Sequence, residues 1–300
     1  MTLSPQAFAY VSDLVRREAA IVLGPGKEYL VEARLLPLAR AAGAADVSAY
    51  VSSLQRSGNP TQRMAVVEAL TTNETSWFRD GEPFEVFRST VLPELLSSTP
   101  PTRRLNIWSA ACSSGQEAYT IAMLLADHGQ GRKAEILASD LSTEMLDRTK
   151  AGAYSQLEIG RGLPAPMMVK HFRRAGTQWQ VSDQLRAMVR TQRINLATPF
   201  PPLPVFDVVF LRNVLIYFDA PTKKAILQRV RQVLSPQGYL FLGGAETTLG
   251  IDDSWGRTTI GRFTLYRPQA ATPGANPPVA TAPLTTTVLP PRWAAAAEGR

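Results

Sequence analysis

Two acidic residues, Glu117 and Asp140, follow short apolar runs at positions where they could bind a ligand. Residues 105–108 are apolar and lead into a loop of small side chains, 109–115, which is followed by Glu117 near the start of a helical pattern. Small side chains between a strand and a helix let a ligand lie close to the backbone and to the helix N-terminus. Asp140 ends the next apolar run, where an acid can accept hydrogen bonds from ribose hydroxyls. Together these segments predict a site for a nucleoside-containing cofactor.

The loop lacks the phosphate-binding patterns of two large classes of nucleotide-binding protein. It has neither the G-x-G-x-x-G of nicotinamide dehydrogenases nor the G-x-x-x-x-G-K-[ST] of P-loop NTPases. S-adenosylmethionine suits such a loop, because its sulfonium and amino acid need acceptors rather than donors to phosphate. Glu117 would then accept from the amino group and Asp140 from the ribose. Taken alone, Glu117 is explained better as a first-turn glutamate stabilised by the helix dipole.

Strand-like and helix-like segments alternate beyond residue 102, which predicts an α/β fold with a mostly parallel sheet covered by helices on both faces. Ligands of such folds bind at the carboxyl ends of the strands, where loop 109–115, Asp140, Asn195 and Arg212-Asn213 would converge. The strand runs are 105–108, 136–138, 189–196, 206–211 and 239–242, and the helices fall at about 116–127, 143–151 and 221–234.

Residues 1–80 show helical spacing throughout and predict a small N-terminal helical domain. A second helix should begin near Glu28, and Pro37 must kink or end it. Asp46 is suited to cap a third helix, and Asn59-Pro60 supplies the cap and first turn of a fourth.

Two further segments depart from the alternation. Short strand patterns within about 172–193 predict a small inserted β-subdomain in the second domain, which we place at 81–267. Residues 268–300 are rich in Pro, Ala and Thr. Such a composition buries too little apolar surface to offset chain entropy, so we expect a disordered tail or linker.

The charge is uneven along the chain. The net charge is +7, and residues 151–200 hold seven basic against two acidic residues. This segment suggests an acidic macromolecular partner, although a solvated basic face without function is about as consistent with the charge alone. No aromatic-rich platform or helix-turn-helix signature favours nucleic acid. No apolar run is long enough for a membrane helix, no secretory leader is visible, and one cysteine with two histidines forms neither a disulfide nor a zinc site. We expect a cytoplasmic protein without membrane insertion.

Four stretches in a fixed order give the chain a family resemblance. They are 70–80 (LTTNETSWFRD), 108–117 (WSAACSSGQE), 206–219 (FDVVFLRNVLIYFD) and 234–246 (LSPQGYLFLGGAE). Together they closely resemble the chemotaxis receptor methyltransferases, the CheR-type protein-glutamate O-methyltransferases, over about residues 5–267. The resemblance implies an N-terminal helical domain followed by a Rossmann-like, S-adenosylmethionine-dependent methyltransferase domain.

The resemblance also implies roles for individual residues. Tyr217 would lie beside the transferred methyl group, and Arg79 would orient the reacting groups, so both are candidate catalytic residues. Asn73 and Thr75 are also explained by capping and turn chemistry, and Tyr217 by an aromatic core position. The implied cofactor contacts are Asn73, Thr75, Arg79, Glu117, Asp140, Asn195, Leu196, Arg212 and Asn213.

The implied reaction is methyl transfer from S-adenosylmethionine to glutamates of the acidic helical coiled coil of a chemoreceptor, leaving S-adenosylhomocysteine and glutamyl methyl esters. A glutamate with a pKa of about 4.3 is already an anion at neutral pH and needs no general base. The enzyme's work is then mainly alignment and removal of water. Two alternatives stay open: a methyltransferase of the same fold acting on another protein, a small acid or RNA, and a non-catalytic regulator that binds the cofactor.

One departure from the family concerns the receptor. The family loop after Phe172 is long and glycine-rich in members that tether to a receptor's C-terminal peptide. Here residues 173–178 are short and contain one glycine. We therefore predict that the chain acts without a C-terminal pentapeptide tether. Trp77 and Gln116 replace residues common in the family, and neither change should abolish cofactor binding.

Overall fold

The computed structural model describes residues 3–269. Of the tail expected at 268–300, only the first two residues fall within this range, and Pro268 is the last residue of a strand. Residues 270–300 lie outside the described part of the chain.

Four helices form the N-terminal part, as the sequence predicts. Their buried apolar faces make one core, which includes Val11, Val31 and Val67. Asp46 accepts a hydrogen bond from the backbone of Ala49, and Asn59 from two backbone N–H groups, so both predicted caps are confirmed. The helices are α1 (Pro5–Ala19), α2 (Glu28–Ala41), α3 (Val47–Ser57) and α4 (Pro60–Leu70).

Pro37 does not end α2, because the helix continues to Ala41. The sequence predicted a kink or an end at Pro37, and the structure excludes the end. Val31 and Leu35 before the proline and Ala39 after it are all buried in the same core. Proline cannot make one of the helical backbone hydrogen bonds, and burial of the apolar residues on both sides of it offsets that loss.

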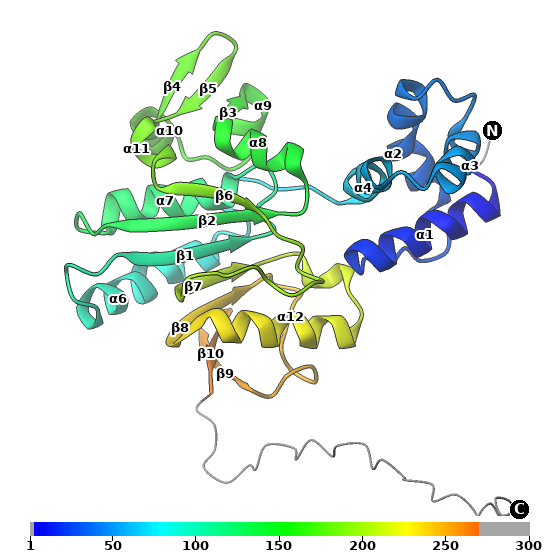
Figure 1. Cartoon of the computed structure of the whole chain (residues 1–300). Coiled ribbons are helices and arrows are strands. Elements are labelled where there is room, and N and C mark those ends of the chain that lie inside the picture. The colour runs from blue at the N-terminus through cyan, green and yellow to red at the C-terminus, as the bar shows by residue number, and fades with distance from the viewer. Residues whose placement is uncertain (1–2, 270–300) are drawn as a thin grey trace, which may run out of the picture. The chain divides into compact units, whose positions relative to one another are not determined.

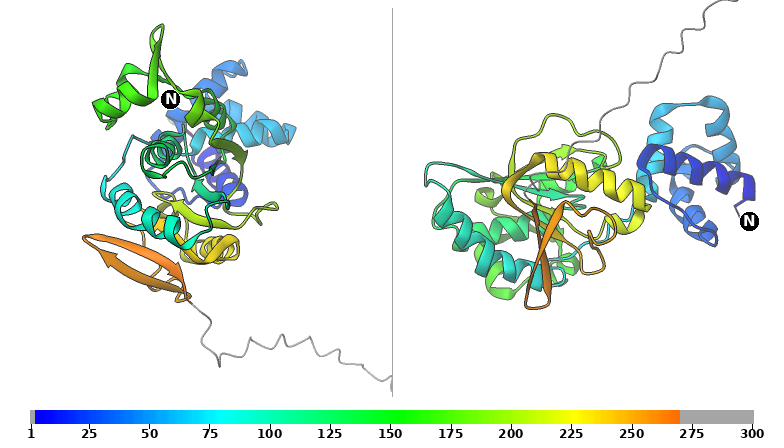
Figure 2. Two further views of the ribbon diagram at one scale, coloured as in Figure 1. Left: turned by 90° about the vertical axis from the view of Figure 1, so that its left-hand side faces the viewer. Right: turned by 90° about the horizontal axis from the view of Figure 1, so that it is seen from below.

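A seven-stranded sheet in the order β6-β2-β1-β7-β8-β10-β9 forms the centre of the second part (Figure 1). Its first five strands in this order pair in parallel, which confirms the predicted parallel sheet, and β9 and β10 add an antiparallel edge. The hairpin of β9 and β10, drawn in orange in Figure 2, was not predicted from the sequence pattern. The strands are β1 (Leu105–Ala110), β2 (Ala134–Asp140), β6 (Val189–Arg193), β7 (Phe206–Leu211), β8 (Leu234–Leu242), β9 (Trp255–Ile260) and β10 (Phe263–Pro268).

Helices cover both faces of this sheet. Phe210 of β7 points into one core with Phe241, whose ring stacks on it at 4.4 Å between centroids, whereas Val209 and Leu211 point into the other. This alternation is the pattern of a strand buried on both faces. The first face carries α5 (Glu82–Val86), the π-helical turn η1 (Phe87–Val91), α6 (Leu92–Ser98), α7 (Gln116–His128) and α8 (Thr143–Ala151), and the second carries α12 (Ala220–Val233).

A second, three-stranded sheet in the order β3-β5-β4 forms the inserted β-subdomain (Figure 1). It differs from the predicted span of 172–193, because β6 pairs with β2 of the main sheet. A helical turn at Asp183–Arg186 leads the chain back to the main sheet, and strand propensity does not encode such a change of partner. The elements here are β3 (Ala153–Ser155), α9 (Gln156–Ile159), α10 (Ala165–His171), β4 (Phe172–Ala175), β5 (Gln178–Val181) and α11 (Asp183–Arg186).

Candidate functional site

The loop between β1 and α7 follows an unusual backbone path. Three of its residues, Ala111, Ser113 and Gly115, have positive φ angles. Residues other than glycine rarely adopt this backbone conformation. A Cβ atom at Gly115 would lie 2.8 Å from the side chain of Thr149. The backbone N–H of Ser113 donates to Asp140 at 2.8 Å, and its hydroxyl donates to the carbonyl of Asn73 at 2.6 Å. The loop therefore joins the end of β2 to the segment that follows α4.

Asp140 lies at the carboxyl end of β2 and is 7% exposed. Each carboxylate oxygen accepts one backbone N–H, Oδ1 from Ser142 at 2.9 Å and Oδ2 from Ser113 at 2.8 Å. Burial raises the pKa of Asp140 above its ordinary value, although these two hydrogen bonds act in the opposite direction. A carboxylate oxygen accepts more than one hydrogen bond, so the group keeps acceptor capacity for a pair of hydroxyls such as those of a ribose.

Glu117 and Arg212 form an ion pair at the adjacent strand ends. Arg212 Nη1 donates to Glu117 Oε2 at 2.9 Å, and Ser109 Oγ donates to Glu117 Oε1 at 2.8 Å. Arg212 Nη2 also donates to the carbonyl of Arg79 and to Asp80 Oδ2. The Arg212 side chain is only 2% exposed. Arg212 thus fixes the Glu117 carboxylate and attaches the segment around residue 80 to the sheet, a role that sequence reasoning did not assign.

The segment between α4 and α5 carries Asn73, Thr75 and Arg79 along one wall of the site. Arg79 Nη1 donates to the carbonyl of Glu74 at 2.9 Å, and Asn73 Oδ1 accepts from the hydroxyl of Thr71 at 3.2 Å. These local bonds agree with turn chemistry at Asn73.

Trp77 anchors this segment from behind. Its side chain is 1% exposed, and its Nε1 donates to the carbonyl of Glu158 at 3.0 Å. Its ring packs edge-on against Tyr154 and Phe172. The tryptophan therefore fills a core position between the site and the β-subdomain.

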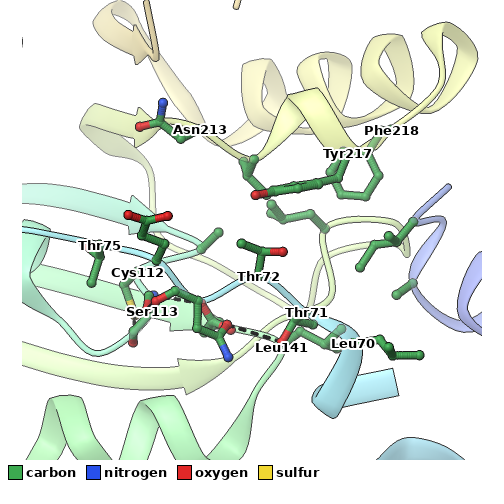
Figure 3. A pocket seen from close by; sticks show the side chains of 18 of the residues that line it. Leu70, Thr71, Thr72, Thr75, Cys112, Ser113, Leu141, Asn213, Tyr217 and Phe218 are labelled. Atoms are coloured by element: carbon green, nitrogen blue, oxygen red, sulfur yellow. Dashed lines mark hydrogen bonds between the residues drawn. The ribbon is translucent and has the colours of Figure 1, made fainter. Parts of the chain in front are cut away.

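Asn213 and Tyr217 lie on the loop after β7. Asn213 has a φ of 57°, a left-handed conformation. The carbonyl of Tyr217 accepts a hydrogen bond from the backbone of Val22 at 3.2 Å, which joins this loop to the segment after α1. Figure 3 shows Tyr217 and Phe218 on one side of a pocket, with Ser113 and Leu141 across from them.

Asn195 and Leu196 follow β6, where a turn ends the strand earlier than the predicted residue 196. Asn195 Oδ1 accepts from the backbone of Ala197 at 2.9 Å and forms this turn. Its Nδ2 donates to the carbonyl of Glu18 in α1 at 2.6 Å. Asn195 thus links the helical domain to the strand end, and both of its side-chain polar atoms already have protein partners.

All ten predicted site residues line one pocket, whose walls enclose about 1190 Å³ including the open mouth. This brings together residues from five separate segments of the sequence. The helical domain contributes a wall that the sequence did not predict, made by Val22 and Lys27 between α1 and α2 and by Leu30 of α2. Among residues 3–269 no group of acidic, histidine or cysteine side chains is arranged to hold a metal ion. Within the same range no helix is long and apolar enough to cross a membrane.

The donors and acceptors of this pocket fit S-adenosylmethionine. Two carboxylates reach it, Glu117 from the first turn of α7 and Asp140 from the end of β2, and its loop has no phosphate-binding pattern. Carboxylates suit an ammonium group and ribose hydroxyls.

Comparisons with known proteins cover nearly the whole described chain. Residues 6–71 match the family described as "CheR methyltransferase, all-alpha domain", and residues 73–260 match "CheR methyltransferase, SAM binding domain". Chemotaxis protein methyltransferase Cher2 of Pseudomonas putida is 42% identical over 248 residues, which cover 80% of this chain and 90% of that protein. Chemotaxis protein methyltransferase 1 of Pseudomonas aeruginosa is 41% identical over 260 residues, 84% and 94% of the two chains. A chemotaxis protein methyltransferase of Vibrio parahaemolyticus is 38% identical over 273 residues, 89% and 98%.

Proposed function

The chain belongs to the CheR family of S-adenosylmethionine-dependent chemotaxis methyltransferases, and we propose that it methylates glutamate side chains of a chemoreceptor to give glutamyl methyl esters. The observation that carries this proposal is the single pocket in which Glu117, Asp140, Arg79 and Tyr217 meet. A glutamate acceptor, with a pKa of about 4.3, is already ionised at neutral pH and needs no general base.

The chain's own residues would hold the cofactor in a defined orientation. Asp140 accepts from the ribose hydroxyls with the lone pairs that Ser113 and Ser142 leave free. Glu117, fixed by Arg212 and Ser109, accepts from the amino group. S-adenosylmethionine, when bound, supplies a methyl group already activated by its attachment to a positively charged sulfur.

The acceptor end of the pocket would be formed by Tyr217 and Arg79. The phenol of Tyr217 can donate to a carboxylate, and the Arg79 guanidinium offsets the negative charge of that carboxylate. Apolar side chains such as Leu30 and Phe218 line the same pocket and exclude water from the reacting groups. The contribution to the rate is mainly alignment of the carboxylate with the methyl group.

The receptor would meet the basic segment 151–200 and the helical domain in the cytoplasm. Six of the seven basic residues in this segment lie within 4.0 Å of a carboxylate. Such exposed pairs contribute little free energy, so these side chains can exchange partners with an acidic coiled coil. The seventh, Arg174, lies on the hairpin of β4 and β5, over the ring of Trp179.

The deciding experiment is incubation with methyl-labelled S-adenosylmethionine and a receptor cytoplasmic fragment. We expect base-labile label on the fragment and none on a matched fragment whose target glutamates are replaced by alanine. Label that is stable to base, or label only on RNA or a small acid, would contradict the proposal. Product binding without turnover on any receptor fragment would favour a regulator instead.

Independence from a receptor tether is tested separately. The β4–β5 turn consists of Gly176 and Thr177 only, since Ala175 pairs with Gln178. We expect no measurable affinity for a receptor C-terminal pentapeptide. Affinity that disappears when residues 173–182 are deleted would contradict this expectation.

A further inference from the structure

A buried carboxylate holds the loop that carries Asn213 and Tyr217. Glu246, which follows β8, is 9% exposed. Its Oε1 accepts from the backbone N–H groups of Val214 at 2.9 Å and Leu215 at 2.7 Å. Its Oε2 accepts from those of Asn213 and Gly243, both at 2.7 Å. Four backbone N–H groups thus donate to one carboxylate. Three of them belong to the loop after β7, which precedes Glu246 by 31 to 33 positions in the sequence.

The loop has the geometry of an anion-binding nest. Asn213 is left-handed at a φ of 57°, and Val214 follows at a φ of −124° and a ψ of −34°. This turn points consecutive N–H groups toward one point, where an anion is favoured. A left-handed residue other than glycine costs free energy, so the conformation needs a group that holds it.

Gly243 leaves the space in which this contact forms. A Cβ atom at this position would lie 2.8 Å from Glu246 Oε2 and 2.9 Å from the backbone nitrogen of Asn213. No side chain fits there without moving one of the two groups. The end of β8 is therefore shaped for a close approach between Glu246 and the loop after β7.

We propose that Glu246 is a positioning residue for methyl transfer, which holds Asn213 and Tyr217 against the pocket through the loop backbone. Leu215–Tyr217 form one 3-10 turn, and the N–H of Tyr217 donates to the carbonyl of Val214. Fixing Val214 and Leu215 therefore fixes the start of that turn and the side chain of Tyr217. The inference rests on the proposed function for the role of Tyr217, but the anchoring itself does not.

Glu246→Gln is the sharpest perturbation, because it keeps the shape of the side chain and removes two acceptor sites. The amide nitrogen is a donor, so it must face two backbone N–H groups that now donate to a carboxylate oxygen. We expect the loop to leave its left-handed conformation and kcat to fall about 100-fold, as misplacement of a reacting group by about 1 Å does. S-adenosylhomocysteine affinity should change by less than about tenfold, because Asp140 and Glu117 lie on other elements.

Two variants control for a general loss of stability. Glu246→Asp keeps the charge and all the acceptor sites, and it should recover at least about tenfold in kcat over the glutamine variant. Asp252→Asn changes another buried carboxylate on the same connection, one that accepts from the backbone of Ser254 at 3.0 Å. It should keep wild-type kcat.

Amide hydrogen exchange over residues 211–218 of the full chain tests the anchoring without any acceptor. Faster exchange there in Glu246→Gln, with α7 unchanged, is the expected result, and unchanged exchange would overturn the proposal. Wild-type kcat in the glutamine variant would overturn it too, as would an aspartate variant as inactive as the glutamine one. If the wild-type chain methylates no receptor fragment, the proposed function fails while the exchange measurement still tests the anchoring.

Discussion

Replacing Arg212 with glutamine should destabilise the cofactor-free protein by an amount that can be worked out from its partners. The Glu117 side chain is 13% exposed, whereas Asp80 is 46% exposed. Water can solvate Asp80 when the Arg212 cation is removed, so loss of that ion pair lowers the free energy of unfolding by only about 0–1 kcal/mol. Glu117 is left as a desolvated, unpaired anion, which costs about 3–5 kcal/mol. At roughly 2 °C per kcal/mol for a chain of this size, Tm should fall by about 6–10 °C.

A double-mutant cycle with Glu117→Gln separates ion pairing from lost packing. The double variant leaves no buried charge unpaired, since only the half-exposed Asp80 loses its cation, so it should be less destabilised than the sum of the two single variants by about 2 kcal/mol. Differential scanning calorimetry provides the measurement. Arg104→Gln, in an exposed pair with Glu135, is the control and should lower Tm by about 2 °C at most. If Arg212→Gln is as mild as this control, or if the two single effects add within about 0.5 kcal/mol, the counter-ion argument is refuted.

Further outcomes are expected at four residues. Asp140→Asn should weaken S-adenosylhomocysteine binding about 10–100-fold by calorimetric titration, since it exchanges an acceptor for a donor beside two backbone N–H groups. Tyr217→Phe should lower kcat about tenfold without changing the affinity for S-adenosylhomocysteine. If kcat and this affinity fell equally, the phenol would instead contribute to binding of the cofactor. Burial and the charge of Asp140 raise the pKa of Cys112 well above 9.0, so a disulfide reagent at pH 8 should modify this thiol only after unfolding. The stability contributed by the protonated Cys112 thiol is complete below 9.0 and is lost as the pH rises through the folded pKa, which alkaline denaturation curves of wild type and Cys112→Ala would reveal. Pro37→Ala, at an exposed position inside α2, should raise Tm by about 2–6 °C, because it restores a helical hydrogen bond.

The sequence predicted best what depends on neighbouring residues. Strand β7 begins and ends where its apolar run does, and the caps Asp46 and Asn59 accept the expected hydrogen bonds. Periodicity and capping act within a few residues, so they can be read locally. The parallel sheet then follows from the alternation of elements, and it brings the predicted residues to one edge.

Contacts between distant segments could not be predicted in this way. The bond from Arg212 to Asp80 spans 132 positions, and that from Asn195 to Glu18 spans 177. Each depends on the final placement of two elements rather than on a pattern in either one. Glu246 shows the same limit, because its position in a known motif gave no reason to connect it with the loop after β7.

The distribution of charge in the pocket is compatible with the two oppositely charged substrates that the proposed function requires. The pocket contains Glu117 and Asp140, which suit a cationic cofactor but would repel a carboxylate acceptor. Arg212 neutralises Glu117 at 2.9 Å from within the core, and Arg79 adds a second cation to the pocket lining. Under the proposed function, the acceptor would approach a site close to neutral, and the basic segment outside the pocket would attract an acidic partner. Arg212 would thus let the pocket carry the acid that a cationic cofactor needs without repelling a negatively charged acceptor.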